Sequence, residues 1–160
     1  MKNSHSVSFG VVICALAAAV VHGYLVVKYT IFWGRELGDL KGFDKFSTVK
    51  AIYGTIIFGF GFCIKFHSDD ILLRLRKERE LGYRMPKGGF FHLVTSANYL
   101  GELVQWGGFG FAFLNPGNVA MILSVGLSLV PRAYHVNRWY RLKFPEEDWS
   151  RKKCIFPGWF

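Results

Sequence analysis

Polar side chains that can bind a ligand or transfer a proton recur within one apolar stretch, residues 90–114. They are His92, Thr95, Asn98, Glu102 and Gln105. An ionisable side chain inside a membrane-length segment costs about 2 kcal/mol or more, so it marks a candidate functional site. Thr95, Asn98 and Glu102 have the spacing i, i+3, i+7 of one helix face, and His92 extends that face by a turn. We expect the amide and carboxylate to bind a ligand's amide or ribose hydroxyls; alternatively, they only join helices.

Basic side chains flank this stretch. Arg76 and Arg84 lie before it, together with Asp69, and Arg132 follows it. A guanidinium donates two parallel hydrogen bonds to a phosphate, so these arginines suit a phosphorylated ligand. The alternative is that they only mark one side of a membrane or attract anionic lipid headgroups.

Residues 131–140 form a third candidate cluster. If this segment is helical, Arg132 shares a face with His135, and Arg132 and Val136 share a face with Tyr140. These side chains could bind a phosphate and stack on an aromatic ring. An aromatic belt at the membrane boundary would explain the same residues equally well.

The composition restricts the class of protein. The 160 residues are 51% hydrophobic and 18% aromatic, with a net charge of +9. A basic chain binds nucleic acid, an anionic membrane surface or a phosphorylated ligand. The membrane-length runs argue against nucleic acid, so we expect a lipid bilayer as partner and no nucleic acid. The three cysteines and scattered histidines predict neither a disulfide framework nor a metal site.

The elements that would position these residues are membrane helices. Apolar runs at residues 7–27, 49–66, 90–114 and 119–130 predict an all-α membrane bundle of about four spans, forming one domain over residues 1–160. A signal peptide is the alternative for the first run. The last run is short, but its helix could continue through Pro131.

The connections carry their own signals. Residues 67–88 suggest a short amphipathic helix at the interface, capped by Ser68 or Asp69, and ended by Pro86, Gly88 and Gly89. Residues 115–118, Asn-Pro-Gly-Asn, predict a turn. Glycines also recur within the predicted helices, at Gly59, Gly61, Gly107 and Gly108. They indicate close helix packing.

The distribution of Lys and Arg predicts the orientation. With four spans, the start of the chain, the 67–88 connection and the C-terminal tail lie on one side and carry fourteen Lys and Arg. The opposite side carries five. The positive-inside rule places the richer side in the cytosol, where a soluble phosphorylated cofactor would arrive.

Three segments together resemble one protein family, the steroid 5α-reductases. Residues 67–77 (His-Ser-Asp-Asp-Ile-Leu-Leu-Arg-Leu-Arg-Lys), 83–91 (Tyr-Arg-Met-Pro-Lys-Gly-Gly-Phe-Phe) and 96–102 (Ser-Ala-Asn-Tyr-Leu-Gly-Glu) are similar to family motifs. Further matches are Trp106, Arg132-Ala133, Arg138-Trp139-Tyr140, Phe144, Arg151-Lys152 and Pro157. The resemblance covers about residues 50–160.

The resemblance implies a seven-span oxidoreductase of the endoplasmic reticulum membrane that uses NADPH. Such enzymes reduce a Δ4 double bond conjugated to a 3-ketone in a steroid or related lipid enone, and the enolate charge that develops requires an acid near the ketone. By resemblance, residues of this chain would line the NADPH site: Asp69, Arg76, Asn98, Glu102, Arg132, His135 and Tyr140. The resemblance assigns no catalytic residue.

Three departures from the family pattern affect this expectation. Lys65 replaces an asparagine on the adenosine side, and His135-Val136-Asn137 replaces a His-His run. The chain also begins at what would be the fourth span, so the family's glutamate and tyrosine that hold the ketone have no counterpart. We therefore expect a C-terminal portion with little turnover alone. The alternatives are a trans-2-enoyl-CoA reductase, or a non-catalytic homologue that retains only the cofactor-binding half.

Overall fold

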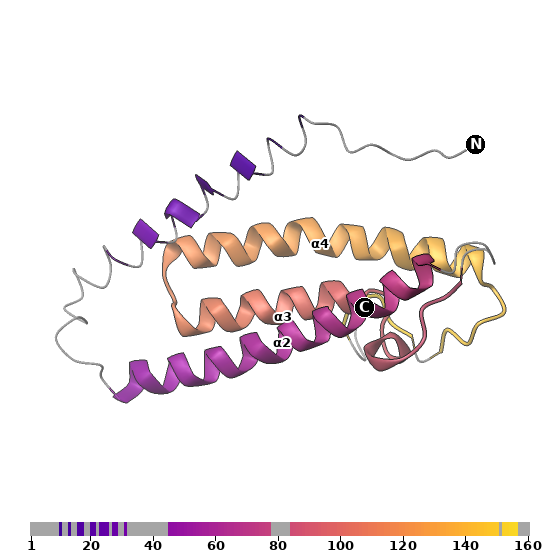
Figure 1. The fold of residues 1–160 in the computed structure, drawn as a ribbon, viewed down its shortest axis with the longest axis horizontal. Coiled ribbons are helices and arrows are strands. Elements are labelled where there is room, and N and C mark those ends of the chain that lie inside the picture. The colour runs from indigo at the N-terminus through magenta and orange to yellow at the C-terminus, as the bar shows by residue number, and fades with distance from the viewer. Residues whose placement is uncertain are drawn as a thin grey trace.

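Three long helices and one short helix form the described part of the protein. The computed structural model describes residues 45–77, 84–150 and 152–156, and isolated positions between 10 and 31. Its elements are α2 (Lys45–Lys77), the 3-10 helix η3 (Gly89–His92), α3 (Ala97–Ala112) and α4 (Pro116–Lys143). Antiparallel neighbours α2 and α3 lie side by side, and α4 returns along α3 (Figure 1). The prediction of an all-α class is confirmed.

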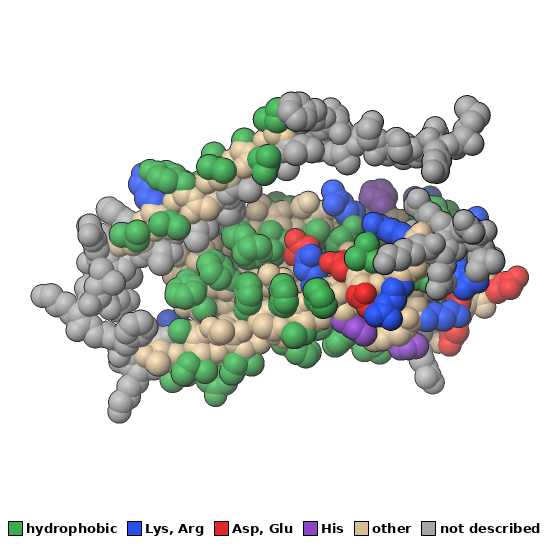
Figure 2. Space-filling view, viewed as in Figure 1, with side chains coloured by type: hydrophobic (Ala, Val, Ile, Leu, Met, Phe, Trp, Pro, Cys, Tyr) green, Lys and Arg blue, Asp and Glu red, His purple; other side chains and the backbone are tan. Residues whose placement is uncertain are grey.

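Two of these helices are long and apolar enough to cross a membrane. They cover Thr48–Arg76 and Pro116–Lys143. The expected span at residues 7–27 lies outside the continuously described residues. Most apolar side chains on the visible face follow the helices, whereas charged side chains gather mainly at the end where α2 finishes (Figure 2). Leu127 and Phe66 are 77% and 68% exposed, as expected for helices with acyl chains around them.

The prediction of a separate interfacial helix at residues 67–88 is wrong. Helix α2 continues for 33 residues through Lys77, so Ser68 and Asp69 lie inside it and cap nothing. The physical reason is that no glycine or proline interrupts residues 64–77. Ion pairs one turn apart instead support a continuous helix: Lys65 with Asp69 at 3.2 Å, and Arg74 with Asp70 at 2.7 Å.

The third apolar run also differs from its prediction, because α3 begins only at Ala97. Before it, residues 93–96 pair with the C-terminal tail: the Thr95 amide donates to Lys153 O at 2.9 Å, and the Lys153 amide donates to Leu93 O at 2.9 Å. The expected helix face through His92, Thr95, Asn98 and Glu102 is therefore wrong at its first two members. Only Asn98 and Glu102 share a face of α3.

Glycines set the contact between α2 and α3. A Cβ at Gly61 would lie 2.7 Å from Gly101 O, and a Cβ at Gly108 would lie 2.8 Å from Gly54 O. Both distances are shorter than real side-chain contacts, so the backbones touch where no side chain fits. The prediction of close packing is confirmed for Gly61 and Gly108, whereas Gly59 and Gly107 face open space.

Residues 115–118, predicted as a turn, are instead the start of α4. Asn115 caps the helix by accepting a hydrogen bond from the Asn118 amide at 3.0 Å, and Pro116 occupies the first turn, where its missing N–H costs nothing. The helix continues through Pro131 to Lys143, as predicted for the short apolar run at residues 119–130. The 12-residue run therefore belongs to a helix of 28 residues.

The buried core lies at the charged end of the bundle. Its fully buried members are Phe91, Val94, Ala97, Leu100, Ala133, Cys154 and Ile155. Gly88 and Gly89 turn the chain into this core with φ values of 108° and 49°, a region that glycine adopts readily, so their predicted role as breakers is confirmed. Helix ends, loop and tail thus meet in one packed unit.

An ion-pair cluster ties the tail to the α2–α3 connection. Glu147 pairs with Lys87 at 2.6 Å and with Lys152 at 3.3 Å. The hydrogen bond from Lys87 is the largest cause that holds the pKa of the Glu147 carboxyl below its usual value, and Lys152 adds to it, although partial burial opposes both. The carboxylate is therefore charged at neutral pH.

Gly61→Ala is expected to destabilise the protein, whereas Gly59→Ala is not. The first adds a methyl group against the α3 backbone and forces the helices apart, which costs about 1–3 kcal/mol. The second adds a methyl in open space within the same helix. Thermal unfolding in detergent, followed by circular dichroism, compares the two. Equal midpoints for both variants would contradict the close contact.

Glu147→Gln is expected to destabilise the junction by about 1 kcal/mol at neutral pH, as is usual for partly exposed ion pairs. Because the folded pKa is lowered from 4.5, the stabilisation is present above pH 4.5 and is lost as the pH falls through the lower folded value. The unfolding midpoints of wild type and variant should converge once the pH lies below that folded value. Glu146→Gln, at the exposed neighbouring position, is the control. A difference between the two unfolding midpoints that does not change with pH would refute this role of Glu147.

Candidate functional site

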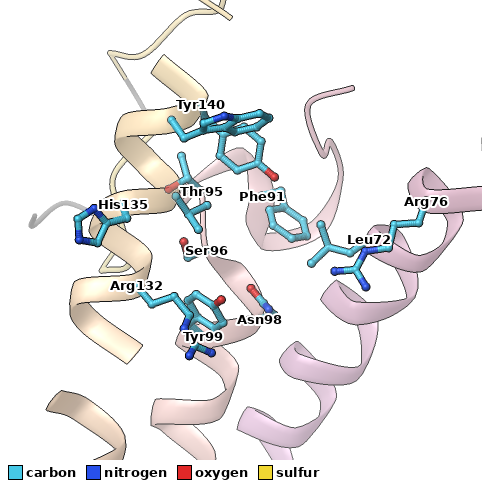
Figure 3. Close-up of a pocket in the computed structure, with 12 residues that line it drawn as sticks. Leu72, Arg76, Phe91, Thr95, Ser96, Asn98, Tyr99, Arg132, His135 and Tyr140 are labelled. Carbon is cyan, nitrogen blue, oxygen red and sulfur yellow. The ribbon is translucent and has the colours of Figure 1, made fainter. Parts of the chain in front are cut away.

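A cavity of about 490 Å³ opens between the ends of the three long helices at the charged end of the molecule. Helix α2 contributes two lining residues, η3 and the start of α3 contribute five, and α4 contributes five. They are Leu72, Arg76, Phe91, Thr95, Ser96, Asn98, Tyr99, Arg132, His135, Val136, Trp139 and Tyr140. Figure 3 shows ten of them labelled, with Ser96 and Asn98 between α2 and α4. Segments separated by some 60 residues thus build one site.

Five of the seven predicted site residues line this cavity. They are Arg76, Asn98, Arg132, His135 and Tyr140. Asp69 lies two turns before Arg76 and pairs with Lys65 instead. Glu102 lies one turn beyond Asn98, half-buried, and does not line the cavity. Contact of these seven residues with a cofactor stays a prediction.

The cavity is electropositive. Arg76 and Arg132 approach it from α2 and α4, both exposed, and no ion pair holds either guanidinium within the described residues. No acidic side chain lines it. The first turn of α3 also faces it, and the free N–H groups of a helix N-terminus attract anions. The site therefore favours an anionic ligand.

Ser96 is a lining residue that sequence reasoning did not single out. It lies at the N-cap of α3 and is only 1% exposed, yet its side chain makes no capping hydrogen bond. Its Oγ is buried with no hydrogen-bond partner among the described residues. A buried hydroxyl without a partner costs free energy, so it marks a position where a ligand can complete the bonding. The position of Ser96 directly before Ala97-Asn98 in the family-like motif was the available signal.

Thr95 has a different role from the one its position suggested. Its hydroxyl donates to Cys154 O at 3.1 Å, and the Ser96 amide donates to the same carbonyl at 3.3 Å. These bonds fasten the tail behind the cavity. Thr95 therefore fixes the position of Ser96 and Asn98.

Apolar and aromatic side chains form the remaining walls. Leu72, Phe91 and Tyr140 gather on one side, and Arg132 extends from α4 toward Tyr99 (Figure 3). Tyr140 is buried at 4% exposure, whereas His135 is exposed and points away from Asn98. Within the described parts of the chain, no three His, Cys, Asp or Glu side chains gather to hold a metal ion. The arrangement combines an anion-binding rim with flat surfaces for rings.

Comparison with known proteins identifies relatives of this chain by sequence. The chain is 36% identical to mouse 3-oxo-5-alpha-steroid 4-dehydrogenase 1 over 143 residues. This alignment covers 89% of the chain and 54% of the mouse protein. The chain is 31% identical over 151 residues to a steroid 5-alpha-reductase of Arabidopsis thaliana, which covers 93% of this chain and 56% of that protein. The chain thus spans about half the length of the curated relatives it matches.

The family match extends beyond the motif-bearing region. Residues 5–160 match the family described as 3-oxo-5-alpha-steroid 4-dehydrogenase, which is nearly the whole chain. The match includes the first apolar run, which lies before the segments that carry the motifs. On this evidence, the chain belongs to the 3-oxo-5-alpha-steroid 4-dehydrogenase family.

Proposed function

We propose that this chain forms the NADPH-binding part of a membrane oxidoreductase. Its substrate would be a steroid or related lipid that carries a carbon–carbon double bond conjugated to a ketone. The observation that carries the proposal is the electropositive cavity, in which Arg76, Arg132 and the unpartnered Ser96 hydroxyl surround Asn98. The names of the relatives, which are steroid dehydrogenases and reductases, favour a steroid over an enoyl-CoA substrate.

The chemistry of the cavity fits a phosphorylated dinucleotide. Two guanidinium groups suit its phosphates, because each offers paired N–H donors to phosphate oxygens. The cavity volume of about 490 Å³ falls within the usual range of about 300–1,000 Å³ for cofactor and small-molecule sites. The buried Ser96 hydroxyl supplies a polar group that the folded chain itself leaves unused.

Each lining residue has a task that its atoms can perform. Arg76 and Arg132 neutralise phosphate charge from opposite sides of the cavity. Asn98 both donates and accepts hydrogen bonds, so it suits a carboxamide or a ribose hydroxyl. NADPH, when bound, supplies the hydride for the reduction. Tyr99 and Trp139 exclude water from the rings that lie against them.

The location of the cavity suits a soluble cofactor and a lipid substrate. It lies at the basic end of two helices with the length and apolarity of membrane spans. We infer that this end, with residues 67–88 and the tail, faces the cytosol, and that the membrane is that of the endoplasmic reticulum. The nucleotide would then enter from water, while the substrate approaches from the bilayer.

Arg76→Ala and Arg132→Ala are each expected to weaken NADPH binding about tenfold. Hydrogen bonds to charged groups contribute about 1.5 kcal/mol or more, and 1.4 kcal/mol corresponds to tenfold. Titration of the protein in nanodiscs, by calorimetry or NADPH fluorescence, measures the affinity. Arg74→Ala is the matched control, because Arg74 pairs with Asp70 on the same helix and does not line the cavity.

Two outcomes would count against the cofactor assignment. The first is a folded wild-type sample that shows no NADPH binding. The second is an equal loss for Arg74→Ala, which would assign the effect to the general charge of this end of the molecule rather than to the cavity.

Ser96→Ala is expected to shift stability and binding in opposite directions. Removing a buried hydroxyl without a partner should raise the stability of the free protein by about 1 kcal/mol, while the loss of a ligand hydrogen bond should weaken NADPH binding by about fivefold. Unfolding midpoints with and without NADPH measure both effects. Ser124→Ala, on the exposed face of α4, serves as control. Unchanged NADPH affinity in Ser96→Ala would exclude its contact with the ligand.

A further inference from the structure

A second basic cavity lies on the opposite side of α4 from the proposed NADPH site. It has a volume of about 430 Å³ and is lined by Tyr134, Asn137, Arg138, Arg141, Lys153 and Cys154. The two cavities share no lining residue. On α4, the residues that line each cavity have the spacing i, i+3, i+4, i+7. The series begins at Arg132 for the first cavity and at Tyr134, two residues later, for the second. A shift of two residues rotates the face by about 200°, so the second cavity is a separate site.

Three cations surround this cavity without an acidic lining residue. Arg138 and Lys153 make no ion pair within the described residues. Arg141 is held in place, because its Nε donates to Asn137 Oδ1 at 2.7 Å and its guanidinium lies 5.1 Å from the centre of the Trp149 ring. The remaining N–H groups of Arg141 stay available for an anion. Such a concentration of like charge is unfavourable until an anion occupies it.

Buried side chains form the base of this cavity, which distinguishes it from a group of charged side chains on an open surface. Asn137 and Cys154 at its base are 7% and 4% exposed. Burial raises the pKa of the Cys154 thiol, although Asn137 and Arg141 oppose this effect, so the floor carries no negative charge at neutral pH. Lys153 is fixed by backbone hydrogen bonds to Leu93 and Thr95. Cations attracted only to the C-terminal dipole of α4 would need no such floor.

An exposed apolar stripe leads along α4 to this cavity. Leu123, Leu127 and Tyr134 have the spacing i, i+4, i+11 of one helix face, and they are 60%, 77% and 50% exposed. The 28 residues of α4 span about 42 Å, longer than the hydrocarbon core of about 30 Å. The last turns, with Arg138 and Arg141, therefore reach the headgroup level. The surface is apolar at acyl-chain depth and cationic at phosphate depth.

We propose that this face of α4 binds an anionic phospholipid. Its phosphate lies among Arg138, Arg141 and Lys153, and an acyl chain lies along Leu127 and Leu123. This site is independent of the proposed function of the first cavity, because neither its residues nor its ligand are shared.

The proposal is tested on the full chain in phosphatidylcholine nanodiscs, with and without phosphatidic acid. Native mass spectrometry after release into detergent measures the retained lipid. We expect wild type to retain phosphatidic acid about tenfold better than the double variant Arg138→Gln/Lys153→Gln. The variant Arg74→Gln/Lys143→Gln removes the same charge outside the cavity and is expected to retain the lipid as wild type does. Arg138→Lys keeps the charge and is expected to retain most of the binding.

Three results would overturn the proposal. An equal loss of lipid retention in both double variants would show that net charge alone retains the lipid. Displacement of the lipid by millimolar glycerol 3-phosphate would indicate a site for a soluble phosphate without a role for the acyl chain. Displacement by NADPH would make the cavity part of the nucleotide site. Loss of the lipid in Arg138→Gln/Lys153→Gln, but not in Arg74→Gln/Lys143→Gln, is the result that the proposal requires.

Discussion

The close approach of the α2 and α3 backbones fixes the geometry on which the rest of the molecule depends. Gly61 and Gly108 meet backbone atoms of the facing helix where no methyl group would fit. A glycine contact of this kind leaves no freedom to slide, because any other register would bring side chains together. This register brings Leu72 and Arg76 to the cavity that Ser96 and Asn98 also line. The cavity at the charged end is therefore a consequence of packing nearer the middle of the helices.

The C-terminal tail, residues 152–156, completes the packed unit at the charged end of the helices. Residues 153 and 154 hold the strand-like segment before α3 through main-chain bonds, and Ile155 joins the buried core. This pairing delays the start of α3 until Ala97 and leaves Ser96 as an N-cap with an unused hydroxyl. The same tail contributes Lys153 and Cys154 to the second cavity. One short segment thus supports the sites on both faces of α4.

The sequence predicted the helices better than their ends. The apolar runs that form α2 and α4, and the glycines Gly61 and Gly108, are local signals, and the structure agrees with them. The long continuation of α2 was missed because the charges after Phe66 suggested a boundary, whereas a helix ends only where its backbone bonding is interrupted. The start of α3 depends on Lys153, some 60 residues away, which no local pattern reveals. Five predicted site residues gather in one cavity, but the partner of Asp69 and the position of Glu102 depend on side-chain geometry.

The shortness of α3 has a consequence for the bilayer. Its 16 residues extend about 24 Å, less than the hydrocarbon thickness that its neighbours exceed. Lipids beside such a helix compress, or water and headgroups descend to meet its end. In a bilayer, such thinning would draw the aqueous boundary toward the first turn of α3, which holds Asn98. In the function proposed above, the water-soluble hydride donor and the hydrophobic acceptor would meet at this depression, with neither leaving its own phase.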